Sequence, residues 1–290
     1  MIEIKNLRKV YEHIGKDKGK TEKIAVDGLT LSIGTGEVFG LLGPNGAGKT
    51  TTIRMLTMLT MPTSGEILYD GHRVGEEEDA RAIKQLIGVV PQNLNFDQDL
   101  TVGENLELHA RLYHMGREER ERRIEELLEY VELSDVINDT VKRLSGGMKR
   151  RLLIARALIH HPKILFLDEP TVALDPQVRR RIWELIKKMA AEGATILITT
   201  HYIEEAEAIC DRVAIMNRGK LLAIDTPKNF ISRLGGFVVE WNEGVHREFR
   251  LFATREDASS FLGSLDEAAS IRRSNLEDVF IELTGRKEGL

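Results

Sequence analysis

The chain has 290 residues, of which 42% are hydrophobic and 30% charged, and this composition excludes a disordered or fibrous protein. The 41 Lys and Arg residues against 46 Asp and Glu residues give a formal charge of −5, so bulk attraction to nucleic acid is excluded and any bound phosphate needs a local site. The lone Cys210 excludes an intrachain disulfide, and the sequence has neither an apolar signal segment nor an apolar run of about 18 to 20 residues, which predicts a soluble, cytoplasmic protein.

The first distinctive stretch lies between Tyr11 and Ala25. Its sequence, EHIGKDKGKTEKI, is charged and contains glycine but almost no apolar residues. Such a segment has little to bury, so we expect residues 12–24 to form a flexible loop.

A short strand predicted at 37–42 runs directly into GPNGAGKTT, in which Gly43, Gly48, Lys49 and Thr50 have the spacing of a P-loop. Glycines let successive backbone N–H groups turn around a phosphate, and the helix predicted next, TTIRMLTMLT, adds its positive end. We expect Lys49 to reach the outer phosphates and the Thr50 hydroxyl to bind Mg²⁺. A glycine-rich loop without a ligand is the alternative, and the ordered strand, loop, Lys and helix disfavour it.

Gln92 follows the strand-like run LIGVVP, and the chain then becomes helical. Thr101 and Glu104 have the spacing of a capping box, which predicts a helix start. The charges at 117–123 have mixed signs, so we interpret them as a solvated helix face rather than a nucleic-acid patch.

The sequence LSGGMKRR at 144–151 predicts a helix that begins with Ser145 as its N-cap and two glycines in its first turn. The free N–H groups, the absence of a carboxylate in this turn and the cations Lys149, Arg150 and Arg151 all suit a phosphate. The alternative is an ordinary N-cap on a basic surface helix, and this segment alone favours that alternative.

Two further apolar strands end in polar residues. KILFLDEP predicts a central strand with Asp168 and Glu169 at its carboxyl end, and TILITTH predicts another with His201 at its tip. Together with the P-loop, Asp168 suits the metal, Glu169 suits the attacking water and His201 suits a γ-phosphate contact. Plain loop solvation for the carboxylates and a structural role for the histidine are the alternatives.

The segment after residue 227 predicts a small α+β appendage. FVVEWNEGVHREFRLF has strand-like stretches around the turn at 242–244, and TREDASSFLGSL predicts a short capped helix. A final helix is expected with Ser274 and Glu277 in capping-box spacing and Gly285 as its C-cap.

Taken in chain order, these motifs resemble those of the ATP-binding cassette (ABC) ATPases over roughly residues 2–227. Two positions depart from the usual family pattern: Met148 stands where many relatives have Gln, and Ala173 stands where Gly is usual, before Leu174. The closing LEDVFIELTGR is similar to the end of drug-export ABC ATPases of the daunorubicin-resistance type.

The resemblance implies ATP and Mg²⁺ as cofactors and assigns roles to individual residues. Glu169, His201, Lys49 and Gln92 would be catalytic, and Thr50, Gln92 and Asp168 would hold the metal. Asp175, in the ALDP loop at 173–176, would cross a dimer interface. The nucleotide-binding residues would be Tyr11, which stacks on adenine, Gly43, Pro44, Asn45, Gly46, Ala47, Gly48, Lys49, Thr50 and Thr51, together with Ser145, Gly146 and Gly147, which act on the ATP of a partner.

The resemblance also implies an architecture. We expect an α/β fold with a P-loop NTPase core and a mainly parallel sheet, an antiparallel β-subdomain and a helical subdomain, plus the small C-terminal α+β appendage. The ABC domain would span 1–227, with the helical subdomain inserted at about 93–159, and the appendage would span 228–290.

The resemblance further implies an ATPase subunit of an export system, on the inner face of the membrane. It would act as a homodimer or heterodimer joined through ATP and would drive a separately encoded transmembrane permease, with no nucleic-acid partner. A soluble ABC-type regulator of ribosomes or DNA is the alternative, although such relatives usually carry two cassettes or a long coiled coil. A sensor that does not hydrolyse ATP is disfavoured because Glu169 and His201 are both present.

Overall fold

A six-stranded, mainly parallel sheet forms the centre of the computed structural model, which describes residues 1–14, 20–74, 77–172, 174–243, 246–265 and 268–285. Its five parallel strands are short apolar runs because both faces of the sheet are covered. They are β9 (Arg212–Asn217), β3 (Val38–Leu42), β8 (Thr195–Thr200), β7 (Ile164–Asp168) and β6 (Ile87–Val90). Along β7, Leu165 and Leu167 join one core cluster, and Ile164 and Phe166 join the other. The strand order is β10, β9, β3, β8, β7 and β6, and the edge strand β10 (Lys220–Asp225) runs antiparallel to β9.

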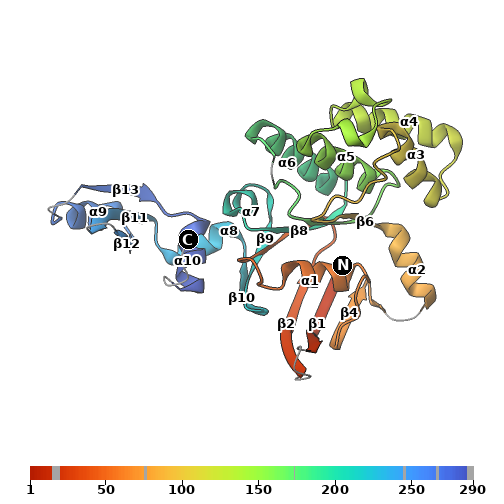
Figure 1. Cartoon of the computed structure of the whole chain (residues 1–290). Helices are drawn as coiled ribbons and strands as arrows, with labels where there is room; N and C mark the ends of the chain where they lie inside the picture. Colours follow the sequence, from red (N-terminus) through yellow and green to blue (C-terminus); the bar gives the residue numbers. More distant parts are fainter. Residues whose placement is uncertain (15–19, 75–76, 173, 244–245, 266–267, 286–290) are drawn as a thin grey trace.

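An antiparallel sheet lies against one side of this centre (Figure 1). Its order is β2 (Lys20–Ile33), β1 (Ile2–Ile14), β4 (Ser64–Tyr69) and β5 (His72–Arg73). The flexible loop expected at 12–24 is wrong for most of its length. Strands β1 and β2 continue as a paired ladder in which Glu12 lies opposite Glu22 and Ile14 lies opposite Lys20, so backbone pairing orders the described part of this charged stretch. Residues 15–19 lie outside the described residues.

Helices cover the other side of the sheet (Figure 1). The predicted capping box is confirmed: Thr101 accepts from the N–H of Glu104, and the Glu104 carboxylate accepts from the N–H of Thr101. The helix after the P-loop ends at Leu56, four residues earlier than expected, and Thr57 is its C-cap. The helices on this side are α3 (Val102–Leu112), α4 (Arg117–Tyr130), α5 (Gly146–Leu158), α6 (Pro176–Ala191) and α7 (Ile203–Ile209), with 3₁₀ turns at Ser134–Val136 and Val141–Arg143. Helices α1 (Lys49–Leu56) and α2 (Glu77–Leu86) lie instead on the side of the antiparallel sheet and pack in its core cluster (Figure 1).

The C-terminal part forms the predicted α+β arrangement. A three-stranded sheet of order β12 (His246–Phe252), β11 (Phe237–Glu243) and β13 (Ala269–Arg273) carries α9 (Arg255–Leu262), while α8 (Pro227–Leu234) and α10 (Leu276–Thr284) pack together beside α7. The turn residues 244–245 lie outside the described residues.

The start of α10 differs from the prediction by one residue. Asn275, not Ser274, is the N-cap, and its capping-box partner is Asp278 rather than Glu277. The Ser274 hydroxyl instead donates to the carbonyl of Gly235, which ties the helix start to the end of α8. Gly285 is the C-cap as expected, with a φ of 91° that favours glycine.

A stack of aromatic rings joins α3 to the end of α5. The rings of Tyr113 and His160 are parallel with centroids 3.6 Å apart, and His109 lies 5.3 Å from Tyr113. Burial lowers the pKa of both His109 and His160 to about 4, and the positive charge of Arg156 opposes protonation of His109. Both histidines are therefore neutral in the folded chain at neutral pH.

This stack predicts a loss of stability in mild acid. In the unfolded chain both histidines return to a pKa near 6.5, so between pH 6.5 and 4 the unfolded state binds up to about two more protons than the folded state. The free energy of unfolding should fall as pH decreases through this window. Thermal unfolding at stepped pH measures the effect. His160→Gln should be less stable at pH 7.5 but lose less stability on acidification, and an unchanged pH slope would contradict the assignment.

Among the described residues, no helix combines the length and apolar character that crossing a membrane requires.

Candidate active site

The P-loop connects the buried strand β3 to the first turn of α1. Gly48 stands before the helix with a φ of 105°, where a Cβ would approach the carbonyl oxygen of Ala25 to 2.5 Å, so only glycine fits without strain. At Gly43 a Cβ would approach the carbonyl oxygen of Met216 to 2.4 Å. Asn45 and Gly46 are exposed at the tip of the loop. The loop is therefore pressed against neighbouring backbone at both ends and open between them.

Lys49 lies at the floor of this loop and is 5% exposed. Its Nζ donates to the carbonyl oxygens of Gly43 at 2.7 Å and Pro44 at 3.2 Å, and it lies 3.8 Å from Oε1 of Glu169. Burial lowers the pKa of the Lys49 ammonium, and the carboxylates of Glu169 and Asp168 oppose that shift. The ammonium thus lies between the loop that would hold phosphates and the carboxylates at the end of β7.

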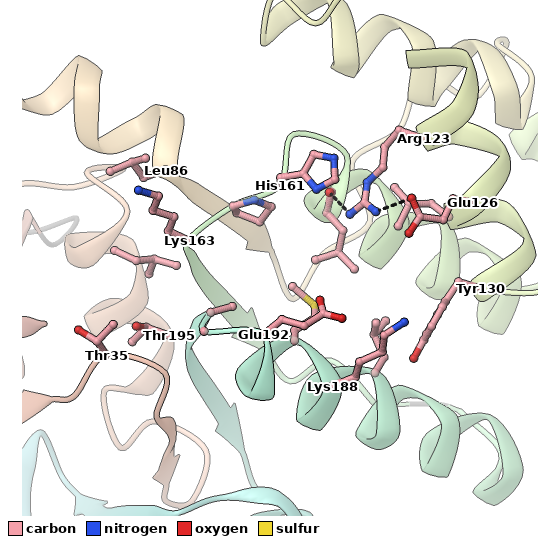
Figure 2. A pocket seen from close by; sticks show the side chains of 18 of the residues that line it. Thr35, Leu86, Arg123, Glu126, Tyr130, His161, Lys163, Lys188, Glu192 and Thr195 are labelled. Carbon is pink, nitrogen blue, oxygen red and sulfur yellow. Dashed lines mark hydrogen bonds and ion pairs between the residues drawn. The ribbon is translucent and has the colours of Figure 1, made fainter. Parts of the chain in front are cut away.

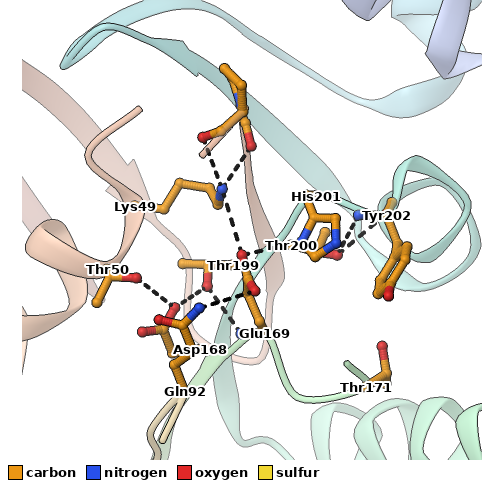
Figure 3. Close-up of polar contacts among 12 residues, drawn as sticks. Lys49, Thr50, Gln92, Asp168, Glu169, Thr171, Thr199, Thr200, His201 and Tyr202 are labelled. Carbon is orange, nitrogen blue, oxygen red and sulfur yellow. Dashed lines mark hydrogen bonds and ion pairs between the residues drawn. The ribbon is translucent and has the colours of Figure 1, made fainter. Parts of the chain in front are cut away.

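Asp168 is the last residue of β7 and is 3% exposed. Its Oδ1 accepts from the hydroxyls of Thr50 at 3.2 Å and Thr199 at 2.6 Å. Thr50 belongs to α1 and Thr199 to β8, so the carboxylate joins three elements (Figure 3). A buried carboxylate beside a threonine hydroxyl is an oxygen donor set of the kind that Mg²⁺ prefers. The residues present therefore fit the metal that the sequence predicts.

Glu169 is the point on which the other predicted residues converge (Figure 3). Its carboxylate lies 3.2 Å from Nδ1 of His201, and its Oε2 accepts from Nε2 of Gln92 at 3.4 Å. Its φ of 51° lies in the left-handed region, which costs a non-glycine residue about 1 to 2 kcal/mol. The strained backbone turns the carboxylate back over the P-loop toward Lys49.

Buried polar residues that the sequence reasoning missed support this constellation. Glu205 of α7 is fully buried, and its Oε1 accepts from the Thr171 hydroxyl at 2.8 Å and from Trp183 Nε1 at 2.9 Å. It therefore links the loop after Glu169 to the helix after His201. The sequence gave no sign that Glu205 is buried, because a carboxylate exposed on a helix would stand at the same position after His201.

The Ser145 segment caps its helix as predicted, but two of the three cations that follow it bind elsewhere. Ser145 is exposed and its hydroxyl accepts from the N–H of Met148, and a Cβ on Gly146 would meet no atom within 4 Å. The expectation that three cations face a phosphate is wrong for two of them. Arg150 is buried beneath the end of β7, and Arg151 donates to the carbonyl of Val131. Both side chains donate to backbone carbonyls of their own chain that would otherwise lack a partner. The position of a residue along its helix does not reveal this use.

Two further predicted residues, Tyr11 and Asp175, make contacts within their own elements. Tyr11 is on β1 opposite Lys23, with the ammonium of Lys9 5.1 Å from its ring centroid. Asp175 is exposed and caps α6 by accepting from the N–H groups of Gln177 and Val178. Ala173, at which the sequence departs from the glycine usual in the resembling family, lies outside the described residues.

A separate cavity of about 460 Å³ opens near the amino ends of β7 and β8, at the edge of the sheet opposite the P-loop (Figure 2). Helices α4 and α6 form its walls, and its charges lie in pairs such as Arg123 with Glu126. Lys188 lies 5.3 Å from the ring centroid of Tyr130. None of the chemical residues predicted from sequence lines this cavity, so the P-loop edge is the candidate active site.

A P-loop with its lysine, a threonine beside a buried aspartate, and a glutamate contacted by a histidine at the carboxyl edge of a parallel sheet together define a nucleoside triphosphate hydrolase of the P-loop class. The model of the ABC transporter family matches residues 26–172. The chain belongs to that family.

Similar proteins agree with this assignment. The chain is 40% identical to the Nod factor export ATP-binding protein I of Burkholderia thailandensis, covering 93% of this chain and 95% of that protein. It is 42% identical to the protein of the same name from Rhizobium meliloti, covering 93% of this chain and 86% of that protein. The chain is therefore an ABC ATP-binding subunit, an ATPase, homologous to the ATP-binding subunits of export systems.

Solved structures agree with the fold. A dimeric ATP-binding cassette in a post-hydrolysis state, bound to ADP and phosphate, has a TM-score of 0.72 at 32% identity over 78% of this chain and 98% of that chain. The structure of an ATP-binding subunit of an ABC transporter has a TM-score of 0.74 at 25% identity over 98% of this chain and all of the other. The predicted α/β class is confirmed.

Proposed function

We propose that the chain is the ATP-hydrolysing subunit of an export system, that two cassettes close head to tail around two ATP molecules, and that this closure drives a separate transmembrane permease from the inner face of the membrane. The observation that carries the proposal is the convergence of Lys49, Gln92 and His201 on the one carboxylate of Glu169. Both relatives are named as export ATP-binding proteins, and we extend the function in export to this chain.

Each residue at the P-loop edge has a role in this proposal. Lys49 leaves the carbonyl oxygens of Gly43 and Pro44 to bind the outer phosphates, because an anion is a stronger partner for an ammonium than a neutral carbonyl. Glu169 accepts a proton from the attacking water, and His201 holds the γ-phosphate. Thr50, Asp168 and Gln92 would hold Mg²⁺, which when bound neutralises charge on the phosphates.

The remaining binding residues act at the rim. Tyr11 would stack on adenine. The open segment Ser145, Gly146 and Gly147 would present its N–H groups to the ATP of the second cassette, which its exposure supports. The proposal divides the chain into an ABC domain at 1–227, with a helical subdomain at about 93–159, and a C-terminal domain at 228–290. This division is supported by the separate three-stranded sheet after α8.

The permease would dock on a groove of about 640 Å³ between α2 and α3. Leu112, on α3, lines the groove and is 65% exposed, and Arg81 and Lys84 line the α2 side. Leu108, one turn earlier on α3, is 49% exposed beside the groove. Exposed leucines on one helix face, bordered by charge, fit a short amphipathic segment of a partner.

A pulldown tests both the permease and its docking groove. The tagged Glu169→Gln chain is purified in mild detergent with Mg²⁺-ATP, and co-purified proteins are identified by mass spectrometry. A stoichiometric multi-span membrane protein is the expected result. Leu112→Glu, added to this chain, should lower its recovery about tenfold or more, because a charge in the groove costs over 1.4 kcal/mol of binding. Leu283→Glu, at a leucine 40% exposed on α10, is the matched control.

Ribosomal or DNA-bound partners with no membrane protein would overturn the export assignment and leave the ATPase chemistry standing. Equal recovery of the permease with Leu112→Glu and Leu283→Glu would place docking elsewhere.

A further inference from the structure

Arg150, in the second turn of α5, makes more hydrogen bonds than its helix position suggests. Its side chain is 5% exposed, and all five N–H donors of its guanidinium face backbone carbonyl oxygens. Its Nε donates to Pro170 at 2.8 Å, its Nη1 to Pro91 at 2.7 Å and Gln92 at 3.3 Å, and its Nη2 to Asp168 at 2.8 Å and Glu169 at 2.5 Å.

These acceptors belong to two active-site loops. The carbonyls of 91–92 follow β6, and the carbonyls of 168–170 lie where β7 ends, so the sheet ladder leaves them to find other donors. Burial lowers the pKa of Arg150 to about 10, and the carboxylates of Asp168 and Glu169 oppose that shift. The side chain is therefore protonated at neutral pH, with every donor available.

The strained backbone of Glu169 depends on these bonds. A left-handed φ at a non-glycine residue persists only where the surroundings fix it. On the amide side, Thr199 accepts from the N–H of Glu169 at 3.0 Å through its carbonyl. On the carbonyl side, Arg150 binds the oxygens of 168, 169 and 170. The direction of the Glu169 carboxylate is thus set jointly by β8 and by α5.

We propose that Arg150 is a positioning residue that couples the two ATP sites of the dimer, because it ties Glu169 and the Gln92 loop to the helix that begins at Ser145. The inference rests on the proposed head-to-tail dimer, in which the start of α5 covers the ATP of the partner. A shift of α5 on the partner's nucleotide moves the anchor of the chain's own catalytic carboxylate. Hydrolysis should therefore depend cooperatively on ATP.

Substitutions that reduce the number of donors test this role. Lysine supplies at most three donors and glutamine two, so neither replaces the five of arginine. Arg150→Lys and Arg150→Gln should lower kcat about 10- to 100-fold, with Gln the more severe, because small displacements of a catalytic group cost this much. The Hill coefficient for ATP should fall toward 1. The affinity of the isolated chain for ATP should stay within about threefold of wild type, since the P-loop is untouched.

Arg151 gives a matched control. It is the next residue of the same helix, but its Nη1 donates to the carbonyls of Val131 and Glu132, away from both loops. Arg151→Lys and Arg151→Gln should keep kcat and the Hill coefficient within about twofold of wild type, as expected for a residue remote from the reacting atoms. Thermal unfolding of all four variants separates loss of fold from loss of coupling.

A second measurement leaves Arg150 in place. With saturating Mg²⁺-ATP, hydrogen exchange at residues 169–172 is compared between the Glu169→Gln chain, which forms the dimer, and the Glu169→Gln/Ser145→Arg chain, which binds ATP without closing. Slower exchange in the dimer only is the expected result. Equal exchange in both, or folded Arg150 variants that match the Arg151 controls, would overturn the coupling. A wild-type chain that does not hydrolyse ATP would instead overturn the proposed function.

Discussion

Glu169→Gln is expected to bind Mg²⁺-ATP but to hydrolyse it about 100- to 10,000-fold more slowly than wild type, the usual contribution of a positioned general base. The amide keeps the size of the side chain but removes the charge that lies 3.2 Å from Nδ1 of His201 and 3.8 Å from Nζ of Lys49. ATP should remain bound and hold two cassettes together. Phosphate release measures the rate, and size-exclusion chromatography with and without ATP measures the dimer.

Glu204→Gln is the matched control for this result. Glu204 is an exposed carboxylate three residues beyond His201, on α7. Its substitution should leave turnover unchanged. Turnover of Glu169→Gln equal to wild type would show that another group activates the water.

Ser145→Arg is expected to abolish turnover while the isolated chain keeps its affinity for ATP. The segment is exposed and lies on α5, whereas the P-loop of the same chain lies at the start of α1, so in the proposed head-to-tail dimer the bulk of the arginine would act on a partner's nucleotide. Loss of the Ser145 hydroxyl, which caps α5 by accepting from the N–H of Met148, lowers the free energy of unfolding by about 1 kcal/mol, too little to unfold the chain. A fluorescent ATP analogue at low protein concentration measures the affinity of the monomer.

A control variant and the affinity of the monomer together show whether the Ser145 segment acts on the ATP of a partner or on the ATP of its own chain. Ser134→Arg places the same side chain at an exposed serine between α4 and α5, and it should leave hydrolysis intact. A large drop in the affinity of monomeric Ser145→Arg for ATP would mean that the segment reaches its own P-loop.

The sequence was sufficient to predict elements whose chemistry is local. A strand followed by GPNGAGKT rarely serves a purpose other than phosphate binding. The apolar runs that end in Asp168 and His201 predicted parallel strands that meet at one edge of the sheet. The convergence on Glu169 follows from that topology, because carboxyl ends of parallel strands share an edge.

The sequence was insufficient where a side chain could satisfy partners in more than one direction. Arg150 has the helix position of a surface cation, and only the carbonyls exposed at the ends of β6 and β7 draw it inward. The stretch after Tyr11 has loop composition, yet β1 and β2 continue into it as a paired antiparallel ladder. Ser274 and Asn275 are both good N-caps, and the nearby carbonyl of Gly235 decides between them.

The packing of α10 against α7 and α8 has a consequence for biosynthesis. Leu276 and Val279 of this last helix belong to the same apolar cluster as Ile198 of β8 and Leu106 of α3. The ribosome must therefore have released the chain through Val279 before this core can be completed. Until then the outer face of α7, next to His201, stays uncovered and open to aggregation or to chaperones. Because this cluster joins residues as far apart as Val38 and Val279, a chain that stops before α10 leaves it unfinished.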